Sequence, residues 1–329
     1  MTREVMSAIN AMSDELQLAH RLADAADAIS LARYLALDLV VETKPDATPV
    51  TDADRAVEKA IRAILESERP SDLIIGEEFG GKELLESAKP GTRFWIIDPI
   101  DGTKNFLRGV PTWATLIASG RVESAQSLGD PTGSQLNKVI DIGVVSSPSM
   151  GRRWWAERGF GAYLTENFAP ASPLVEAVSP DQRNPGGRTP EITTSKKTTR
   201  RISVSKVASL SDASLSYSDL LGWEERRDVF ISLLDEVWRT RALGDFLSHM
   251  LVAEGAVDIA AEPSLALWDM AALAVIVEEA GGRYSSLDGL DGPFGGSGLA
   301  SNGDLHEEVL KRLNSKNQSS SKNSVAEIQ

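Results

Sequence analysis

Hydrophobic side chains follow a helical period near the start of the chain. Between Ser13 and Leu39 they recur mostly at steps of three and four residues, which is typical of one face of an amphipathic helix. Two prolines in the segment 44–49 end this pattern. A second helix is predicted to begin at Asp52 to Asp54, where short acidic side chains can cap it. Its apolar face carries Val57, Ile61, Ile64 and Leu65.

Short continuous apolar runs predict buried strands in the first half of the chain. Two of them, 73–75 and 94–97, each end in an acidic cluster. Further strands are expected at 113–118, 139–145 and 154–157. Because successive side chains of a strand point to opposite faces, Trp154 and Trp155 should lie on opposite sides of the sheet, with at least one of them in the core.

The second half of the chain alternates between strand and helix patterns, which indicates α/β order. The predicted elements are a strand at 202–205, helices at 224–237 and 246–252, a strand at 257–261 and a helix at 265–280. Between the two halves, the segment from Glu166 to Arg200 is polar, rich in Pro, Ser and Thr and without a period, so it predicts a long surface loop.

These patterns divide the chain into four parts. They are an N-terminal α+β part at 1–160, a polar insertion loop at 161–201, a C-terminal α/β part at 202–313 and a polar tail at 314–329 that is expected to be disordered.

Composition places the protein among ordinary globular proteins, with 42% hydrophobic and 25% charged residues in a chain of 329. No apolar run is long enough to span a membrane, and Met1 to Asp14 lack the basic start and apolar middle of a signal peptide. These features predict a cytoplasmic protein with no membrane partner.

Charge and residue counts narrow the possible chemistry. A formal net charge of −14 argues against binding to a nucleic-acid backbone. The chain has no cysteine, so thiolate nucleophiles and cysteine-bound metals are excluded. Its three histidines are too widely spaced for a histidine-rich metal centre. Hard cations bound by carboxylates remain.

The hexapeptide Asp98-Pro-Ile-Asp-Gly-Thr103 offers such a site. Asp98 and Asp101, separated by a proline-stiffened turn, can both point at one metal cluster, and the carbonyl of Ile100 can add a further oxygen ligand. Gly102 and Thr103 can open a helix whose free N–H groups hold a phosphate. Read alone, the hexapeptide fits a simple tight turn equally well, because Asp, Pro and Gly are the usual turn residues.

Two further acidic clusters favour the metal site. Glu77 and Glu78 end the preceding strand, and Asp269 lies at the start of the helix predicted at 265–280. Alone, Asp269 is more typical of a helix cap, and a surface carboxylate pair is normally just solvated. Three acidic clusters at the ends of elements are harder to explain without a shared ligand.

The segments 76–78, 98–103 and 268–271 resemble the signatures of the inositol monophosphatase superfamily and stand in the same order. The resemblance covers roughly Leu16 to Leu313 and departs most clearly at the insertion after Gly161. It implies an α+β / α/β fold, the layered αβαβα sandwich of the inositol monophosphatase and fructose-1,6-bisphosphatase type. It also implies a homodimer.

The same resemblance implies roles for individual residues. Asp54 matches the family aspartate that hydrogen-bonds the motif threonine, which is Thr103 here. Thr103, polarised by Asp54, and Glu77 would orient a metal-bound water for in-line attack on phosphorus, without a covalent phosphoenzyme. Two or three Mg²⁺ ions would be bound by Glu77, Asp98, the Ile100 carbonyl, Asp101 and Asp269.

Haloacid-dehalogenase-type phosphatases are a poorer match. They need an Asp-x-Asp nucleophile after a strand, and that spacing occurs at Asp52 and Asp54, which follow a proline-rich loop and begin a helix.

Substrate choice should come from the second half of the chain. The segments 241–246 and 262–269 resemble the histidinol-phosphatase branch of the superfamily. Glu262 stands where the superfamily commonly contacts the non-phosphate part of its substrate, and Asp245 lies in a Gly-Asp-Phe segment typical of that branch. Carboxylates suit a substrate that carries an ammonium and an imidazole. Asp245 could equally cap the helix that begins near Phe246, and a polyol phosphate could also bond to Glu262.

The sequence therefore predicts Mg²⁺-dependent hydrolysis of L-histidinol phosphate to L-histidinol and phosphate, in histidine biosynthesis. The partner is a small phosphate ester, contacted by Gly102, Thr103, Asp245 and Glu262. One alternative is an inositol-1-phosphate or broad-specificity sugar-phosphate phosphatase, and another is a catalytically silent binding or regulatory protein on the same scaffold. Lys44 could add positive charge near the metal entrance, although loop lysines are usually only solvated.

Overall fold

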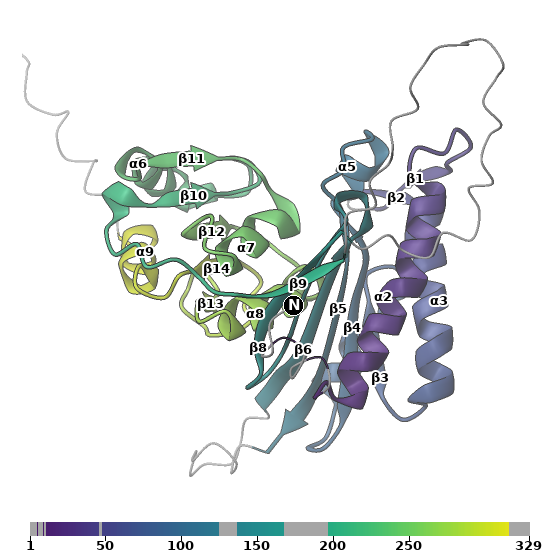
Figure 1. Cartoon of the computed structure of the whole chain (residues 1–329). Coiled ribbons are helices and arrows are strands. Elements are labelled where there is room, and N and C mark those ends of the chain that lie inside the picture. The colour runs from purple at the N-terminus through teal and green to yellow at the C-terminus, as the bar shows by residue number, and fades with distance from the viewer. Residues whose placement is uncertain are drawn as a thin grey trace, which may run out of the picture.

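A computed structural model describes residues 5, 9, 11–45, 48–124, 137–167 and 197–315. Within these residues the chain forms five layers, in which helices alternate with two sheets (Figure 1). One sheet has seven strands in the order β3-β4-β5-β6-β7-β8-β9, and the other has five in the order β11-β10-β12-β14-β13. The predicted αβαβα sandwich is confirmed.

Helices α2 (Asp14–Arg33) and α3 (Asp52–Glu68) form the outer layer against the seven-stranded sheet. Between them runs the short hairpin of β1 (Val41–Thr43) and β2 (Pro49–Thr51). Helix α2 ends earlier than the apolar period predicts, because the backbone becomes extended at Tyr34 and left-handed at Leu35 (φ 63°).

The seven-stranded sheet is the larger core element. Strand β3 runs parallel to β4, and the remaining neighbours are antiparallel. Both Trp154 and Trp155 are buried, on opposite faces, because helices cover both sides of the sheet. Its strands are β3 (Leu73–Gly76), β4 (Arg93–Asp101), β5 (Ala114–Glu123), β6 (Asn137–Ser147), β7 (Arg152–Glu157), β8 (Gly161–Glu166) and β9 (Thr198–Ile202).

Strands β8 and β9 correct part of the predicted insertion loop at 161–201. They pair with each other antiparallel, from Ala162↔Ile202 to Glu166↔Thr198, so the ends of that segment belong to the first sheet. The expected strand at 202–205 ends at Ile202 instead. The sequence Thr-Thr-Arg-Arg-Ile has no apolar alternation, because β9 is an edge strand with mostly exposed side chains. Residues 168–196 and the tail at 316–329 lie outside the described residues, and the division into four parts stays a prediction.

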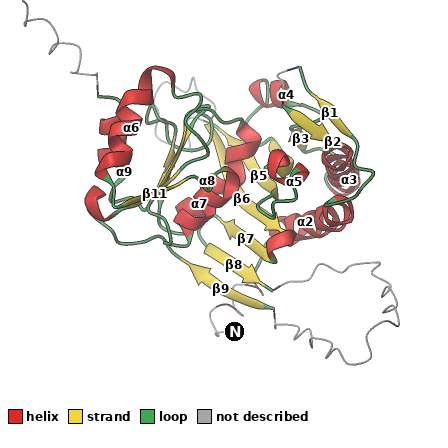
Figure 2. Ribbon diagram, turned by 90° about the horizontal axis from the view of Figure 1, so that it is seen from above, coloured by secondary structure: helices red, strands yellow, loops and turns green. Residues whose placement is uncertain are grey.

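Helices α7 (Asp245–Ala253) and α8 (Leu267–Glu279) lie between the two sheets, as Figure 2 shows. On the far side of the second sheet, α6 (Arg227–Glu236) and α9 (His306–Leu313) close the molecule. Both α7 and α8 are apolar on nearly every side, as expected for helices buried between two sheets.

The remaining elements are short. The second sheet consists of β10 (Ser214–Ser216), β11 (Arg239–Arg241), β12 (Ile259–Glu262), β13 (Arg283–Ser285) and β14 (Gly298–Ser301). Single helical turns are α4 (Lys82–Glu86), α5 (Thr103–Leu107) and the 3₁₀ turns Pro148–Met150, Leu210–Asp212 and Glu224–Arg226. Among the described residues, no helix is long and apolar enough to cross a membrane.

Candidate active site

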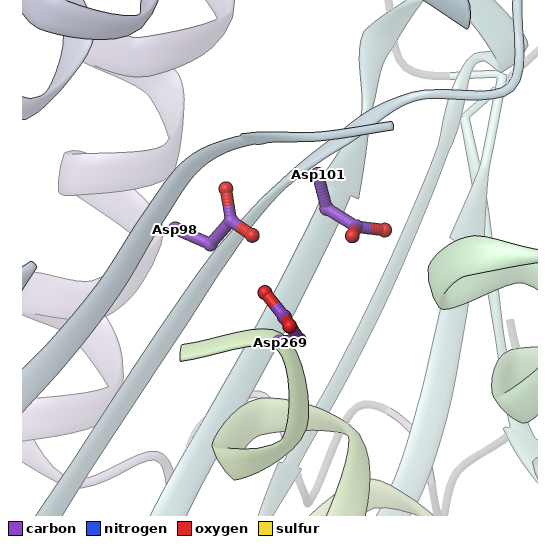
Figure 3. Close-up of side chains that lie close together, drawn as sticks. All are labelled: Asp98, Asp101 and Asp269. Carbon is purple, nitrogen blue, oxygen red and sulfur yellow. The ribbon is translucent and has the colours of Figure 1, made fainter. Parts of the chain in front are cut away.

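Three aspartates from distant parts of the chain meet between the two sheets. Asp98 and Asp101 lie at the end of β4, where the pairing with β5 shifts register between them. Asp269 is the third residue of α8. Each offers a carboxylate oxygen, and these oxygens lie within 4.8 Å of one another (Figure 3). The bulge allows two carboxylates three residues apart to point the same way, which a regular strand does not.

Repulsion between these aspartates contributes to raised pKa values of their carboxyl groups. Burial, followed by the charges of Glu77, Asp101 and Asp269, raises the pKa of Asp98 well above its usual range. Burial and the charges of Asp245 and Asp269 do the same for the pKa of Asp101. Burial raises the pKa of Asp269 to about 7. Holding three ionised carboxylates together therefore requires a compensating positive charge.

The donor set fits a hard divalent cation. It consists of carboxylate oxygens, the ligands that Mg²⁺ and Ca²⁺ prefer. The Oδ1 atom of Asp98 is buried and has no hydrogen-bond partner within the described structure, which is costly for a carboxylate oxygen unless a cation binds there.

Two of the three aspartates also hold the surrounding backbone. Asp101 Oδ2 accepts a hydrogen bond from the N–H of Phe246 at 2.7 Å, in the first turn of α7. Asp269 Oδ2 accepts from the N–H of Ala266 at 2.8 Å, just before α8. The prediction that Asp269 caps its helix and the prediction that it faces a metal are therefore compatible, because each carboxylate has two oxygens.

Glu77 stands outside this group of three. Its Oε1 atom lies 2.7 Å from Nζ of Lys44, which also pairs with Glu78 at 2.5 Å. Burial alone would lower the pKa of Lys44, and its hydrogen bonds with the two glutamates raise it above the usual range. Lys44 is thus no solvated loop lysine, since its side chain is only 18% exposed.

Asp54, Thr103 and Ile100 lie together as the sequence predicts. Thr103 Oγ1 is 3.5 Å from Asp54 Oδ1 and donates to the Ile100 carbonyl at 3.0 Å. Asp54 is 1% exposed, and burial raises its pKa to about 6 although hydrogen bonds from Thr51 oppose the shift. Gly102 lies before α5 with φ 80°, which favours glycine, and the predicted helix after it is confirmed as a single turn.

A cavity of about 380 Å³ opens beside these residues. Its walls come from both halves of the chain and include Glu77, Gly102, Thr103, Lys104, Asn105, Ser218, Asp219, Leu243 and Asp245. Asp245 accepts from Nδ2 of Asn105 at 2.9 Å, and its φ of 49° is rare for a residue with a side chain. Asp245 is the first residue of α7, and the residue at the N-cap position is Gly244, which has no side chain to cap the helix.

Ser218 links Asp245 to Glu262. Its Oγ accepts from the N–H of Asp245 at 3.1 Å and donates to Glu262 Oε1 at 2.7 Å. Glu262, at the end of β12, is 5% exposed, and burial raises its pKa to about 8 with smaller contributions from Asp245 and Asp219. Asp245 and Glu262, two of the four predicted substrate residues, therefore lie in one hydrogen-bonded group.

Several residues that shape the site were not predicted from the sequence. Ser218 and Asn105 belong to no recognisable motif. Ser218 only follows β10 closely, and Asn105 only follows the hexapeptide. Glu58 had a signal: it lies one turn after Asp54, on the face of α3 that carries Ile61, yet it is a charged residue with no exposed surface. A charge on a buried helix face requires partners.

Comparisons with known proteins agree with this geometry. Residues 12–318 match the model of the inositol monophosphatase family. A histidinol-phosphatase of Mycobacterium tuberculosis is 51% identical over 92% of this chain and 98% of its own length, and one of Streptomyces coelicolor is 49% identical over 92% and 97%. Among solved structures, an IMPase of Thermotoga maritima has a TM-score of 0.67 and 26% identity, covering 92% of this chain and 97% of that one.

The family match spans most of the chain, and the two relatives just described are aligned over nearly their full length. The site between the sheets contains the acidic residues that metal-assisted hydrolysis of a phosphate ester requires. The chain therefore belongs to the inositol monophosphatase family and is a phosphoric monoester hydrolase.

Proposed function

We propose that the protein hydrolyses L-histidinol phosphate to L-histidinol and phosphate in a Mg²⁺-dependent reaction, as a step of histidine biosynthesis. The observation that carries the choice of substrate is the acidic wall of the cavity beside the metal group. Asp245 and Asp219 line the cavity, and Glu262 is joined to that wall through Ser218. The relatives named histidinol-phosphatase support the same choice.

An acidic wall suits a cationic alcohol better than a neutral polyol. Glu262 is held in an environment that disfavours its charge, since burial, Asp245 and Asp219 raise its pKa. A substrate ammonium or a protonated imidazole placed there would relieve this repulsion and form charge-assisted hydrogen bonds. The hydroxyls of inositol phosphate carry no positive charge, so they would relieve less of this repulsion.

The metal group binds two or three Mg²⁺ ions in this proposal. The ligands would be Glu77, Asp98, the Ile100 carbonyl, Asp101 and Asp269. When bound, Mg²⁺ would supply a lowered pKa for water and positive charge against the phosphate oxygens and the leaving oxygen.

The chain's own residues orient the attacking water. Thr103 donates a hydrogen bond to Asp54 or to the Ile100 carbonyl, so its oxygen is free to accept a hydrogen bond from the water. Glu77, which lines the same cavity as Thr103, supplies a second acceptor. Gly102, without a side chain, lets a phosphate oxygen approach the backbone N–H groups of the turn. Water attacks phosphorus directly, and no covalent phosphoenzyme forms.

The test is phosphate release by the purified protein with Mg²⁺, comparing histidinol phosphate, inositol 1-phosphate and fructose 1,6-bisphosphate. We expect a strong preference for histidinol phosphate that disappears with a chelator and returns with excess Mg²⁺. A preference for inositol or sugar phosphates would contradict the substrate and leave the metal chemistry standing. No release from any ester would favour the silent scaffold instead.

Two further expectations belong to the same proposal. The protein should be a homodimer, which sedimentation equilibrium of the full chain would measure directly. A monomer across micromolar concentrations would contradict it. The cytoplasmic location and the lack of nucleic-acid binding stay predictions from the sequence.

A further inference from the structure

The loop that carries Glu77 is held in place by a residue outside the proposed active-site set. Residues 76–80 form a tight turn after β3, with hydrogen bonds from the N–H of Gly76 to the carbonyl of Gly80 and from the N–H of Gly80 back to Gly76, at 3.0 and 3.1 Å. The N–H of Glu77 donates to the carbonyl of Ile97 in β4 at 3.2 Å. Three of the five backbone donors of the turn are therefore satisfied by backbone carbonyls.

The other two donors are satisfied by one side chain. The N–H of Glu78 donates to Glu58 Oε2 at 2.7 Å, and the N–H of Phe79 donates to Glu58 Oε1 at 3.3 Å. Glu58 has no exposed surface, so its carboxylate is fully committed to this loop and to Arg62. A carboxylate that accepts two backbone donors fixes the direction of the peptide planes between them.

Arg62, one turn further along α3, binds a backbone carbonyl of the same turn. Its Nη2 donates to the carbonyl of Gly80 at 2.9 Å, and its Nε donates to Glu58 Oε1 at 2.8 Å. The pair therefore binds the turn through both its donors and its acceptors, and the charge of the buried Glu58 is balanced.

Gly76 shows how closely the carboxylate fits. A Cβ atom at position 76 would lie 1.9 Å from Glu58 Oε1, far inside any van der Waals contact. Only glycine allows the carboxylate to approach the turn from that side. The glycine before Glu77 is required by Glu58, since its φ is not in the left-handed region.

We infer that Glu58 is the positioning residue of Glu77: it fixes the turn so that the Glu77 side chain meets Lys44 and faces the metal group. This inference rests on the proposed function, in which Glu77 binds Mg²⁺. Two residues of α3, one helical turn apart, then position parts of the site. Asp54 bonds to Thr103, and Glu58 binds the Glu77 turn.

The experiment is calorimetric Mg²⁺ binding to the full-length Glu58→Gln variant without substrate. The amide of Gln keeps one acceptor oxygen, so one backbone donor of the turn loses its partner and the charge on Arg62 is unbalanced. We expect Mg²⁺ affinity to fall about 10- to 100-fold, the usual effect of losing a group that orients a metal ligand. Hydrogen exchange of the metal-free protein should show faster exchange at residue 78 or 79.

Asp258→Asn is the matched control. Asp258 is likewise buried and accepts from a backbone N–H, that of Ser214, and from the hydroxyl of Ser205, but it directly precedes β12 in the second sheet, whereas the Glu77 turn follows β3 in the first. Its loss should lower the melting temperature and leave Mg²⁺ affinity unchanged. Wild-type Mg²⁺ affinity in Glu58→Gln, with a lowered melting temperature, would reduce Glu58 to a structural residue and overturn the inference.

Glu77→Gln separates this inference from the proposed function. If Glu77→Gln lowers Mg²⁺ affinity and the double variant Glu58→Gln/Glu77→Gln loses little more, the two residues act through one ligand and the inference is supported. Additive losses would overturn it. Wild-type affinity in Glu77→Gln would instead reject Glu77 as a ligand and overturn the inference, while phosphate release from histidinol phosphate would still decide the proposed function.

Discussion

At the scale of single residues, three carboxylates of the site use one oxygen to hold the fold. Asp101 binds the N–H of Phe246, Asp269 binds that of Ala266, and Asp54 accepts from Thr51. Because the second oxygen stays available, the same residue can stabilise an element end and face the cavity. A substitution at one of these residues should therefore change stability and activity to different extents.

Asp101→Asn should separate these two effects. Asn keeps an oxygen that can accept from the N–H of Phe246, but it lacks the charge that a divalent cation requires. We expect kcat/KM to fall by at least about 100-fold, beyond the usual loss for a group that only orients a ligand. The melting temperature of the metal-free protein should not fall, since one member of a mutually repelling group is removed. Wild-type turnover in this variant would reject the metal assignment.

The raised pKa of Glu262 predicts that kcat/KM depends on pH. Its pKa in the free protein is raised to about 8, so at pH 7 the carboxyl is largely protonated and cannot pair with an ammonium. For histidinol phosphate, kcat/KM should therefore rise as pH increases through about 8, as long as the substrate keeps its positive charge.

Glu262→Gln is the control for this profile. The rise with pH should disappear, and kcat/KM above pH 8 should be about tenfold or more below wild type, the worth of a charged hydrogen bond. An unchanged profile in the variant would assign the titration to another group.

At the scale of elements, α3 organises the site from its N-terminal end. Thr51 precedes the helix and forms a capping box with Asp54: its hydroxyl accepts from the N–H of Asp54, whose Oδ2 accepts from the N–H of Thr51. The same Asp54 faces Thr103. The cap that begins the helix therefore also orients a predicted catalytic residue.

Thr51→Ala should affect both helix stability and chemistry. Removing the cap should lower the free energy of unfolding by about 1 to 2 kcal/mol, measured by urea unfolding. Because Asp54 also loses the hydroxyl that holds its Oδ2, kcat should fall while KM changes little. Thr51→Ser keeps the hydroxyl and should restore both values. Loss of stability with wild-type kcat would show that Asp54 needs no support from Thr51.

The sequence predicted these elements unevenly. Amphipathic α3 and apolar α8 were located to within a few residues, because one has a clear period and the other a long apolar run. Strand β4 continues through Pro99 to Asp101, although the proline and the acids suggested a turn after Ile97. The bulge in its pairing with β5 accommodates the proline, and such irregular pairing leaves no period in the sequence.

At the scale of the whole molecule, the site exists only because two sheets share one layer of helices. Asp98 comes from the first sheet, Glu262 from the second, and Asp269 and Asp245 from the helices between them. The hydrogen bonds from Phe246 to Asp101 and from Asn105 to Asp245 join the two halves at the cavity. Stability of the middle layer and integrity of the site are thus linked.

The buried His249 in this middle layer should make the stability of the folded protein sensitive to acid. It is 1% exposed, and burial lowers its pKa to about 4. The unfolded chain binds a proton near pH 6.5, whereas the folded chain does so only near 4, so stability falls as pH decreases through this window. Between pH 7 and 5 the wild type should lose about 2 kcal/mol more than His249→Leu, measured by urea unfolding at both pH values. Equal losses in the two proteins would show that His249 is protonated when folded.

The sequence by itself determined the family through short motifs, and the resemblance to that family implied the layered fold. Local patterns placed the acidic residues that gather at the site at the ends of elements. Asp98, Asp101 and Asp269 were named from their places at the ends of elements, and they meet. Their assigned roles, and those of Asp245 and Glu262, stay predictions that the variants above test.

Only the tertiary structure decided which oxygen of each carboxylate is free, that Lys44 pairs with Glu77, and that Glu58 holds the Glu77 turn. It also showed that Ser218 joins Asp245 to Glu262. These contacts link residues that are far apart in sequence or whose spacing matches no motif. The physical reason is that they follow from how layers pack and where buried polar groups find partners, and neither leaves a periodic signal along the chain.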